Sequence, residues 1–212
     1  MQWSLVIPLK PLTRAKSRLA DTAGDGLRPA LALAFAQDTV AAALACPAVA
    51  DVAVVTDDEL ASRELGALGA RIVPDTPANG LNAALAHGAA AVREIRPAAP
   101  VAALNADLPA LRARELSRVL SAAAEFGRSF LADAAGSGTT LLATAPGREL
   151  RPAFGIDSRF RHRASGATEL ALAGVDSVRQ DVDRGADLRA ALSLGVGRHT
   201  AAVSTRLPIP GP

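Results

Sequence analysis

The chain has 212 residues, half of them hydrophobic, which is enough for one sizeable core and gives no sign of a second domain. Its 23 basic and 21 acidic residues nearly balance, and only 3% of the residues are aromatic, with no tyrosine. This composition argues against a nucleic-acid-binding surface, which needs a strongly basic face or stacking aromatic side chains. The single cysteine, Cys46, excludes a disulfide framework and a multi-cysteine zinc site.

The first residues lack the basic region and the long apolar run of a signal peptide. Apolar stretches such as 41–45 are rich in alanine and fall well short of the ~20 residues that a membrane span needs. We therefore expect a cytoplasmic protein that makes no contact with membranes.

Apolar runs and alanine-rich stretches alternate along the first 126 residues. The apolar runs predict strands over Trp3–Ile7, Val49–Thr56, Arg71–Val73 and Val101–Leu104. The stretches between and after them predict helices over Arg28–Ala45, 59–68, Asn79–Arg96 with Asn79 as the cap, and Arg112–Phe126. This alternation implies right-handed βαβ units and a mostly parallel sheet, in which ligands collect at the carboxyl ends of the strands.

The alternation loosens after Phe126. Two strands are predicted around a turn rich in glycine and serine, over Phe130–Ala132 and Thr140–Thr144. The remaining predictions are a helix over Ala167–Ala173, a short strand near Val178, a last helix over Asp187–Leu194, and a frayed tail over 203–212.

The loop after the first strand carries four cationic side chains within residues 10–18. Lys10 and Lys16 are the only lysines of the chain, which otherwise uses arginine for positive charge. A compact ammonium suits the oxygens of a triphosphate, so Lys10, Arg14 and Lys16 are candidate nucleotide contacts. The alternative is a solvated basic loop, and the motif of a P-loop is absent.

Acidic residues follow two of the apolar segments. Asp107 comes directly after the strand Val101–Leu104, and Asp181 and Asp183 alternate along an extended segment and point the same way. Carboxylates at such a sheet edge could hold Mg²⁺ against phosphate oxygens. The alternative is that Asp107 and Asp183 cap the helices that follow them. Asp58 is also expected to cap a helix, and the role of Asp57 is left open.

Two further polar regions are candidate binding sites. Asn82 and the backbone near it, at the start of a predicted helix, could contact the ribose or base of a nucleotide, although a generic turn explains the pattern equally well. The segments 136–140 and 154–163 combine glycines and hydroxyls with three arginines, which suit a carboxylate or phosphate. The alternative interpretation is that these segments form a flexible hairpin and the basic face of a helix. No arrangement of a serine or cysteine nucleophile occurs, so covalent catalysis is not expected.

These motifs follow one another in an order typical of a known family. They are Ile7–Pro11, Ala15–Leu19, Val54–Asp58, Gly80–Asn82, Ala106–Pro109, Phe154–Gly155 with Ser158, and Asp181–Asp183. In this order and spacing the chain resembles the CofC-type guanylyltransferases of coenzyme F-420 biosynthesis over nearly its whole length. The first loop differs from the glycine-rich loop of the molybdopterin nucleotidyltransferases, so phosphate contact there depends more on side chains.

The resemblance implies a single domain with a three-layer α/β/α fold and a mostly parallel mixed sheet, like the nucleotide-diphospho-sugar transferases of glycosyltransferase A type. It implies guanylyl transfer from GTP to a small phosphorylated acid, with Mg²⁺ as the cofactor. By the same resemblance, Asp107 and Asp183 are the catalytic metal ligands and Lys16 is catalytic. The other implied contacts are Lys10, Arg14, Lys16 and Asn82 with the nucleotide, and Thr140, Gly155 and Ser158 with the acid.

The acceptor is the least determined part of this prediction. The residues of the motifs resemble those of actinobacterial members of the family. This resemblance favours phosphoenolpyruvate as the acceptor over 2-phospho-L-lactate and 3-phosphoglycerate. A cytidylyl- or molybdopterin-type transferase on the same fold and an inactive nucleotide-binding module remain as alternatives. The sequence leaves open whether the protein forms a homodimer and whether Mn²⁺ replaces Mg²⁺.

Overall fold

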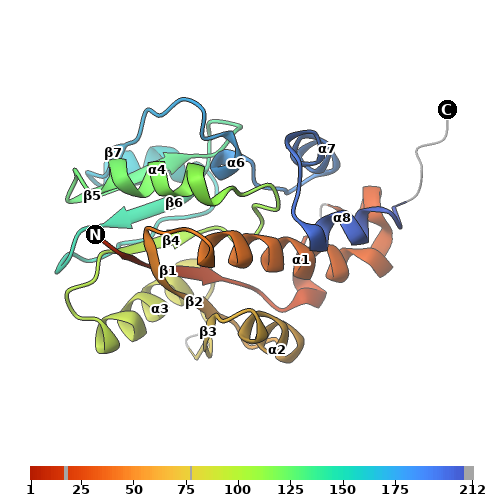
Figure 1. Ribbon diagram of the computed structural model, residues 1–212, viewed down its shortest axis with the longest axis horizontal. Coiled ribbons are helices and arrows are strands. Elements are labelled where there is room, and N and C mark those ends of the chain that lie inside the picture. Colours follow the sequence, from red (N-terminus) through yellow and green to blue (C-terminus); the bar gives the residue numbers. More distant parts are fainter. Residues whose placement is uncertain (17–18, 77, 208–212) are drawn as a thin grey trace.

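A computed structural model describes residues 1–16, 19–76 and 78–207, with residues 20–25 described only as backbone. Within these residues, seven strands form one sheet in the order β3-β2-β1-β4-β6-β5-β7 (Figure 1). Only β6 runs against its neighbours, and all other neighbouring strands of the described sheet are parallel. The prediction of a mostly parallel mixed sheet is confirmed. The strands are β1 (Trp3–Pro8), β2 (Val49–Val55), β3 (Arg71–Val73), β4 (Val101–Leu104), β5 (Arg128–Ala132), β6 (Thr139–Thr144) and β7 (Thr168–Glu169).

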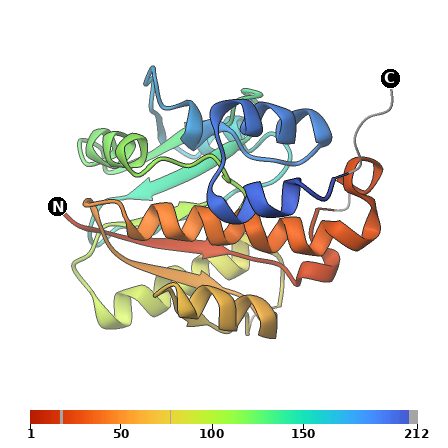
Figure 2. The ribbon, with the colours of Figure 1, turned by 45° about the vertical axis from the view of Figure 1, so that its right-hand side comes forward.

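Helices cover both faces of the sheet and give the fold three layers (Figures 1 and 2). On β1, Leu5 and Ile7 face the core shared with α1 (Ala20–Leu44), α2 (Glu59–Ala67) and α4 (Ala113–Ala123), whereas Val6 faces α3 (Leu81–Ile95). This is the alternation of sides that an extended strand imposes. None of the helices formed by the described residues has the length and apolarity needed to cross a membrane. The other helices are η1 (Leu12–Arg14), α5 (Ser158–Ala164), α6 (Asp176–Arg179), α7 (Gly185–Leu194) and α8 (Arg198–Ser204).

The helix α3 lies unusually close to the sheet. A Cβ atom added to Gly88 would come within 2.5 Å of Cγ1 of Val6 and 2.6 Å of Cγ2 of Val55. Only glycine allows this approach, because any side chain would push α3 away from β1 and β2. The close approach fixes the position of α3, whose first turn reaches the same edge of the sheet as the carboxyl end of β1.

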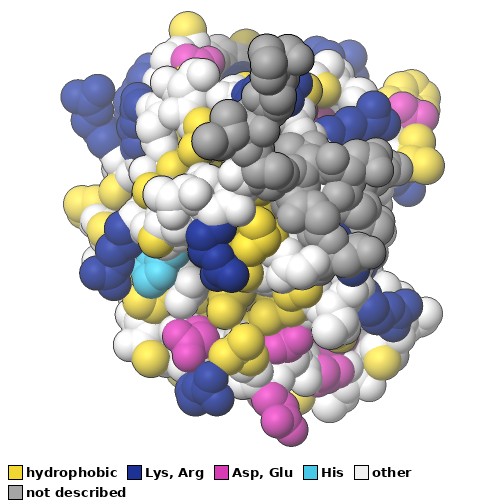
Figure 3. All heavy atoms as spheres, turned by 90° about the vertical axis from the view of Figure 1, so that its right-hand side faces the viewer, with side chains coloured by type: hydrophobic (Ala, Val, Ile, Leu, Met, Phe, Trp, Pro, Cys, Tyr) yellow, Lys and Arg dark blue, Asp and Glu magenta, His cyan; other side chains and the backbone are white. Residues whose placement is uncertain are grey.

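The carboxyl ends of β1, β2 and β4 lie at one edge of the sheet because these strands are parallel neighbours. The chain leaves β1 toward β2 on one side, and β4 lies on the other side of β1. A change of direction of this kind opens a crevice at the strand ends, where ligands of α/β proteins bind. Figure 3 looks onto this edge, where most Lys and Arg side chains lie toward the margin and acidic side chains gather below the centre.

The first long helix begins earlier than predicted. It starts at Ala20 instead of Arg28 and contains Pro29, although the stretch before Arg28 is rich in glycine and aspartate. Leu31 of this helix is buried in a core cluster with residues of α7, and Leu27 packs against that cluster together with Val203 of α8. Tertiary packing therefore holds the helix directly after the stretch whose local helix propensity is poor.

The predictions for the last quarter of the chain were partly wrong. The expected helix over Ala167–Ala173 is absent, because Thr168 and Glu169 instead add β7 to the open edge of β5. The expected strand near Val178 is the short helix α6, with Val178 buried. The helix α8 was not predicted and includes part of the expected tail over 203–212, while residues 208–212 lie outside the described residues.

Candidate active site

The loop after β1 is held in place through its backbone. The Leu12 N–H donates to Oδ2 of Asp58 at 2.8 Å. The guanidinium of Arg28 donates to the carbonyl oxygens of Thr13 at 3.1 Å and Ala15 at 2.7 Å. The backbone of the loop is therefore tied to both the β2–α2 connection and α1.

The three described cations of this loop point in different directions. Lys10 and Arg14 are exposed at the sheet edge. Lys16 has a φ of 55° and a side chain that is only 12% exposed, so it turns inward. Ser17 and Arg18, which belong to the same sequence motif, lie outside the described residues.

The ammonium of Lys16 lies between the two predicted metal carboxylates. Its Nζ forms an ion pair with Oδ2 of Asp107 and a second one with Oδ1 of Asp183 at 2.9 Å. Burial disfavours the charge of Lys16, but the two carboxylates outweigh it and raise the pKa of the ammonium. The structure thus brings together three candidate residues that are up to 167 positions apart in the chain.

Backbone contacts fix this meeting point. The Val182 N–H donates to the carbonyl oxygen of Asp107 at 3.1 Å, which draws the 181–183 segment to the end of β4. From α1, the buried hydroxyl of Thr39 accepts the Leu108 N–H at 3.0 Å and lies 3.2 Å from the carbonyl oxygen of Ala106. Sequence analysis did not identify Thr39, because its partners lie far from it in the chain.

The capping alternative does not describe Asp107 or Asp183. The residue before α4 is Arg112, and before α7 the carboxylate of Asp187 accepts the N–H groups of Asp183 and Arg184 at 3.1 and 2.8 Å. Oδ1 of Asp107 is buried and has no hydrogen-bond partner within the described part of the chain. It is therefore an acceptor available to a ligand.

Asp57 and Asp58 both stabilise backbone. Asp58 caps α2 by accepting the Ala61 N–H at 3.0 Å, as predicted. Asp57, whose role the sequence left open, accepts the Asp75 N–H at 2.8 Å. Both carboxylates thus hold the connections on the β2 side of the crevice.

Asp181 is a further acidic residue at the meeting point. Burial, reinforced by the negative charges of Asp107, Asp183 and Asp133 and opposed by Lys16, raises the pKa of the Asp181 carboxyl to about 8. The spacing of two residues already predicted that Asp181 and Asp183 point to one side of an extended segment, whereas the family resemblance implied only Asp107 and Asp183 as metal ligands.

The predicted acid contacts gather around the start of β6. Thr140 is fully buried, and its Oγ1 has no hydrogen-bond partner among the residues that the structure describes. Its carbonyl oxygen accepts the Asn105 N–H at 3.0 Å, which places it beside the strand end that leads to Asp107. Gly155 has a φ of 112°, and Ser158, which is 2% exposed, begins α5.

The three arginines of α5 are engaged within the protein. Arg159 and Arg163 form ion pairs with Glu169 of β7, and Arg159 also donates to the carbonyl oxygen of Gly136 at 2.8 Å. Arg161 donates to the carbonyl oxygen of Phe154 at 3.1 Å. These contacts fix α5 against the hairpin of β5 and β6, so the arginines hold the fold here.

Asn82 lies in the first turn of α3 and bonds to one backbone unit. Its Nδ2 donates to the carbonyl oxygen of Phe154 at 3.1 Å, and its Oδ1 accepts the Phe154 N–H at 2.8 Å. A direct contact with guanosine would have to replace or share these bonds. The role of Asn82 in nucleotide recognition stays a prediction.

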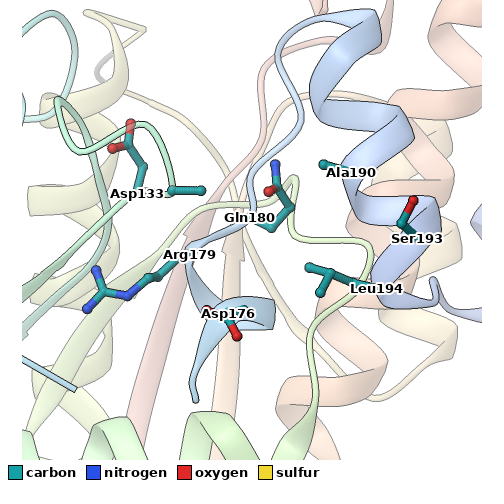
Figure 4. Close-up of a pocket in the computed structure, with 8 residues that line it drawn as sticks. Asp133, Asp176, Arg179, Gln180, Ala190, Ser193 and Leu194 are labelled. Atoms are coloured by element: carbon teal, nitrogen blue, oxygen red, sulfur yellow. The ribbon is translucent and has the colours of Figure 1, made fainter. Parts of the chain in front are cut away.

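A hollow of about 530 Å³ lies behind the carboxylates, between α6, α7 and the turn at Asp133 (Figure 4). Arg179 lines it but donates to the carbonyl oxygen of Ala132 at 2.7 Å. None of the predicted site residues lines this hollow. The chemistry therefore points to the strand ends and not to this hollow.

Comparison with known sequences agrees with this geometry. Residues 3–207 match the profile of the family described as "Guanylyl transferase CofC like". A protein of Streptomyces avermitilis named phosphoenolpyruvate guanylyltransferase is 77% identical over 212 residues, which cover 100% of this chain and 98% of that protein. The match thus extends over all the motifs described above.

Comparison with solved structures shows the fold. A nucleotidyl transferase from Methanothermobacter is 19% identical, with a TM-score of 0.59 over 91% of this chain and 97% of that one. A Mycobacterium tuberculosis protein solved in complex with manganese is also 19% identical, with a TM-score of 0.54 over 91% of this chain and 99% of that one. Other neighbours include nucleotide-diphospho-sugar transferases, so the predicted fold class is confirmed.

Proposed function

Because this chain belongs to the CofC-like guanylyl transferase family, we propose that it transfers the guanylyl group of GTP to phosphoenolpyruvate. The products are enolpyruvyl-diphospho-guanosine and pyrophosphate, within coenzyme F-420 biosynthesis. The name of the Streptomyces avermitilis relative supports this acceptor. The observation that carries the proposal is the ammonium of Lys16 held between Asp107 and Asp183 at the carboxyl edge of the sheet.

The reaction needs no protein nucleophile. An oxygen of the acceptor phosphate attacks the α-phosphorus of GTP in line, and the bond from that phosphorus to the oxygen bridging to the β-phosphorus breaks. The bridging oxygen leaves with pyrophosphate. Such a transfer depends on positioning the two substrates and on neutralising charge, and both tasks suit a crevice lined by cations and acids.

The cations of the first loop are proposed to bind the triphosphate. Lys10 and Arg14 are exposed at the strand ends and offer positive charge to incoming phosphates. Lys16 can exchange a carboxylate contact for a phosphate oxygen, because its ammonium already lies at the crevice. Three cations near the α-phosphorus would stabilise the charge that builds up during transfer.

The carboxylates fit a divalent metal ion, which we propose to be Mg²⁺. The unpartnered Oδ1 of Asp107 is an oxygen donor, and Asp183 offers a second carboxylate at the same point. Within the described residues no three acidic, histidine or cysteine side chains form a ready-made cage, and Mg²⁺ takes one or two carboxylates with phosphates and water as its other ligands. When bound, the ion supplies charge neutralisation at the phosphate oxygens. The manganese complex of the structural neighbour supports a divalent metal.

The acid is proposed to bind near Thr140, Gly155 and Ser158. The unpartnered hydroxyl of Thr140 is a donor that a carboxylate or phosphate oxygen would satisfy. Gly155 is exposed and lacks a side chain, so its backbone can approach a ligand closely. The connection of Thr140 to the end of β4 places this group on the same side as Asp107.

Product analysis tests the proposal directly. The protein would be incubated with Mg²⁺, each of the four nucleoside triphosphates in turn, and phosphoenolpyruvate, and pyrophosphate release would be followed. Mass spectrometry of a competition among phosphoenolpyruvate, 2-phospho-L-lactate and 3-phosphoglycerate would then identify the acceptor. We expect GTP-dependent release and the phosphoenolpyruvate adduct as the main product. Release with CTP alone, or binding of GTP without turnover of any acid, would contradict the proposal.

A further inference from the structure

Two side chains bond to the backbone of the loop 153–158, on which two of the proposed acid contacts lie. We propose that Asn82 and His162 are positioning residues that clamp this loop from two sides and thereby set the affinity for the acid. On this view Asn82 does not read the guanine base. The inference rests on the proposed function, because that function makes the loop an acceptor-binding element.

The Asn82 side of the clamp uses both polar atoms of one amide. The Nδ2 and Oδ1 atoms bond to the carbonyl oxygen and the N–H of the same residue, Phe154, 72 positions away. This pattern imitates the paired hydrogen bonds of neighbouring β-strands and fixes the backbone in position and orientation. Arg161 donates to the same carbonyl oxygen, so Phe154 O has two donors.

The His162 side of the clamp is a buried imidazole. Its Nε2 lies 3.0 Å from the backbone nitrogen of Ala153, and its Nδ1 lies 2.9 Å from Oγ1 of Thr139. A backbone N–H can only donate, so Nε2 accepts, and the proton of the neutral ring is assigned to Nδ1, which donates to Thr139. The ring also packs edge-on against Phe154, with centroids 5.0 Å apart. His162 therefore joins the loop to the first residue of β6.

The loop requires support because its backbone is in an uncommon conformation. Gly155 has a φ of 112° and Asp157 a φ of 53°, a region that non-glycine residues seldom adopt. Two of the three proposed acid contacts are next to a clamped residue: Gly155 follows Phe154, and Thr140 follows Thr139. Loss of either half of the clamp would displace these contacts without touching the cations that bind GTP.

The clamp also gives α3 a defined task. The helix is fixed against β1 and β2 by the close approach at Gly88, so Asn82 in its first turn is a rigid support. A support on a well-packed element can hold a ligand-binding loop more accurately than a neighbouring loop can. The helix α3 thereby connects the strands β1 and β2, against which it packs at Gly88, with the loop 153–158, to which Asn82 bonds.

Steady-state kinetics with both substrates tests this inference. Asn82→Ala and His162→Leu each remove one half of the clamp, while Asn82→Asp keeps an acceptor and His162→Gln keeps a donor and an acceptor. We expect the KM for phosphoenolpyruvate to rise about ten- to a hundredfold in the first pair and less in the second pair. The KM for GTP and the preference for GTP over ATP should stay within about twofold of wild type. Asn79→Ala is the matched control, since Asn79 is exposed and its side chain forms no hydrogen bond with any other described residue.

Amide hydrogen exchange supplies a readout that does not need turnover. Asn82→Ala should speed exchange of the Phe154 amide, and His162→Leu that of the Ala153 amide, with the strand β4 unchanged. A changed preference for GTP over ATP in Asn82→Ala, with an unaltered KM for the acid, would overturn the inference, and so would unaltered exchange at Phe154. If the wild-type protein turns over no phospho-acid, the proposed function fails, and exchange at these two amides alone decides whether the clamp exists.

Discussion

The proposed nucleotide side and the proposed acceptor side of the crevice are built in different ways. On the nucleotide side, Lys10 and Arg14 are exposed and extend from a loop whose backbone is held by other residues. On the acceptor side, Phe154 and His162 are buried, and hydrogen bonds fix the backbone between them. Charge acts at a distance and tolerates exposed, adaptable side chains, whereas holding a small acid for in-line attack demands a fixed geometry.

The carboxylates between the two sides should give the largest effect. Asp107→Asn keeps the shape of the side chain but removes the charge at the point where we propose that the triphosphate and the metal ion meet. Because that charge is worth several kcal/mol in a transition state of this kind, turnover should fall roughly a hundred- to a thousandfold. The measurement is pyrophosphate release at saturating GTP and acid, together with a thermal melt to show that the variant is folded.

Asp176→Asn is the control for this variant, because Asp176 is an exposed carboxylate on α6. It should retain turnover close to that of the wild type. Near wild-type turnover of Asp107→Asn would contradict the proposal that Asp107 is a metal ligand. The two sides of the crevice would then share no catalytic residue.

Acid should weaken the acceptor side first. Burial, together with the positive charges of Arg128 and Arg161, lowers the pKa of His162 from 6.5 to about 4. The imidazole of His162 therefore becomes protonated near pH 6.5 in the unfolded chain but only near pH 4 in the folded chain. His162 contributes fully to the free energy of unfolding above pH 6.5. As the pH falls from 6.5 toward 4, this contribution is lost, and the free energy of unfolding decreases by at most about 3 kcal/mol.

Urea unfolding at pH 7 and pH 4.5 measures this contribution. The free energy of unfolding of His162→Gln should fall less between the two pH values than that of the wild type. His87→Gln, at a partly exposed histidine of α3, should behave as the wild type does. An identical decrease in the wild type and His162→Gln would show that the imidazole is not held neutral by its surroundings.

The exposed cations should give the smallest effect and the strongest dependence on salt. Lys10→Ala and Arg14→Ala should each raise the KM for GTP about three- to tenfold, because an exposed charge contributes on the order of 1 kcal/mol. The increase should shrink above about 0.5 M salt, where exposed charges are screened. The KM for the acid should stay unchanged. A rise in the KM for the acid instead would contradict the proposal that the nucleotide and the acid bind to separate sides of the crevice.

Several features of this molecule could be predicted from short stretches of the chain. Apolar runs separated by helix-forming stretches predicted the parallel strands β1 to β4. Of these, β1 and β4 are buried along nearly their whole length, as expected for strands covered on both faces. The position of Asp107 directly after β4 predicted that its carboxylate lies at the sheet edge. The capping role of Asp58 followed from its place before α2.

Other features depended on contacts between distant segments. The helix α1 extends across a stretch of poor propensity because α8 packs against it, and Thr168 joins the edge of β5 although its surroundings favour a helix. Neither outcome can be derived from local pattern, because each depends on a partner that the chain supplies elsewhere. The same limitation hid Thr39, a single polar residue without a motif around it. It also hid the partners of His162, which lies in the segment 154–163 and bonds to Thr139 and Ala153.

The sequence by itself determined which residues are candidates for catalysis and binding. It also determined that the acidic residues following the strands would lie at one edge of the sheet. Strand alternation and the directionality of a parallel sheet are enough for that conclusion. Only the tertiary structure decided that Lys16 lies between Asp107 and Asp183, and that Asn82 bonds to Phe154. These pairings are set by how closely helices pack on the sheet and by which buried polar atoms need partners, and both are properties of the assembled fold.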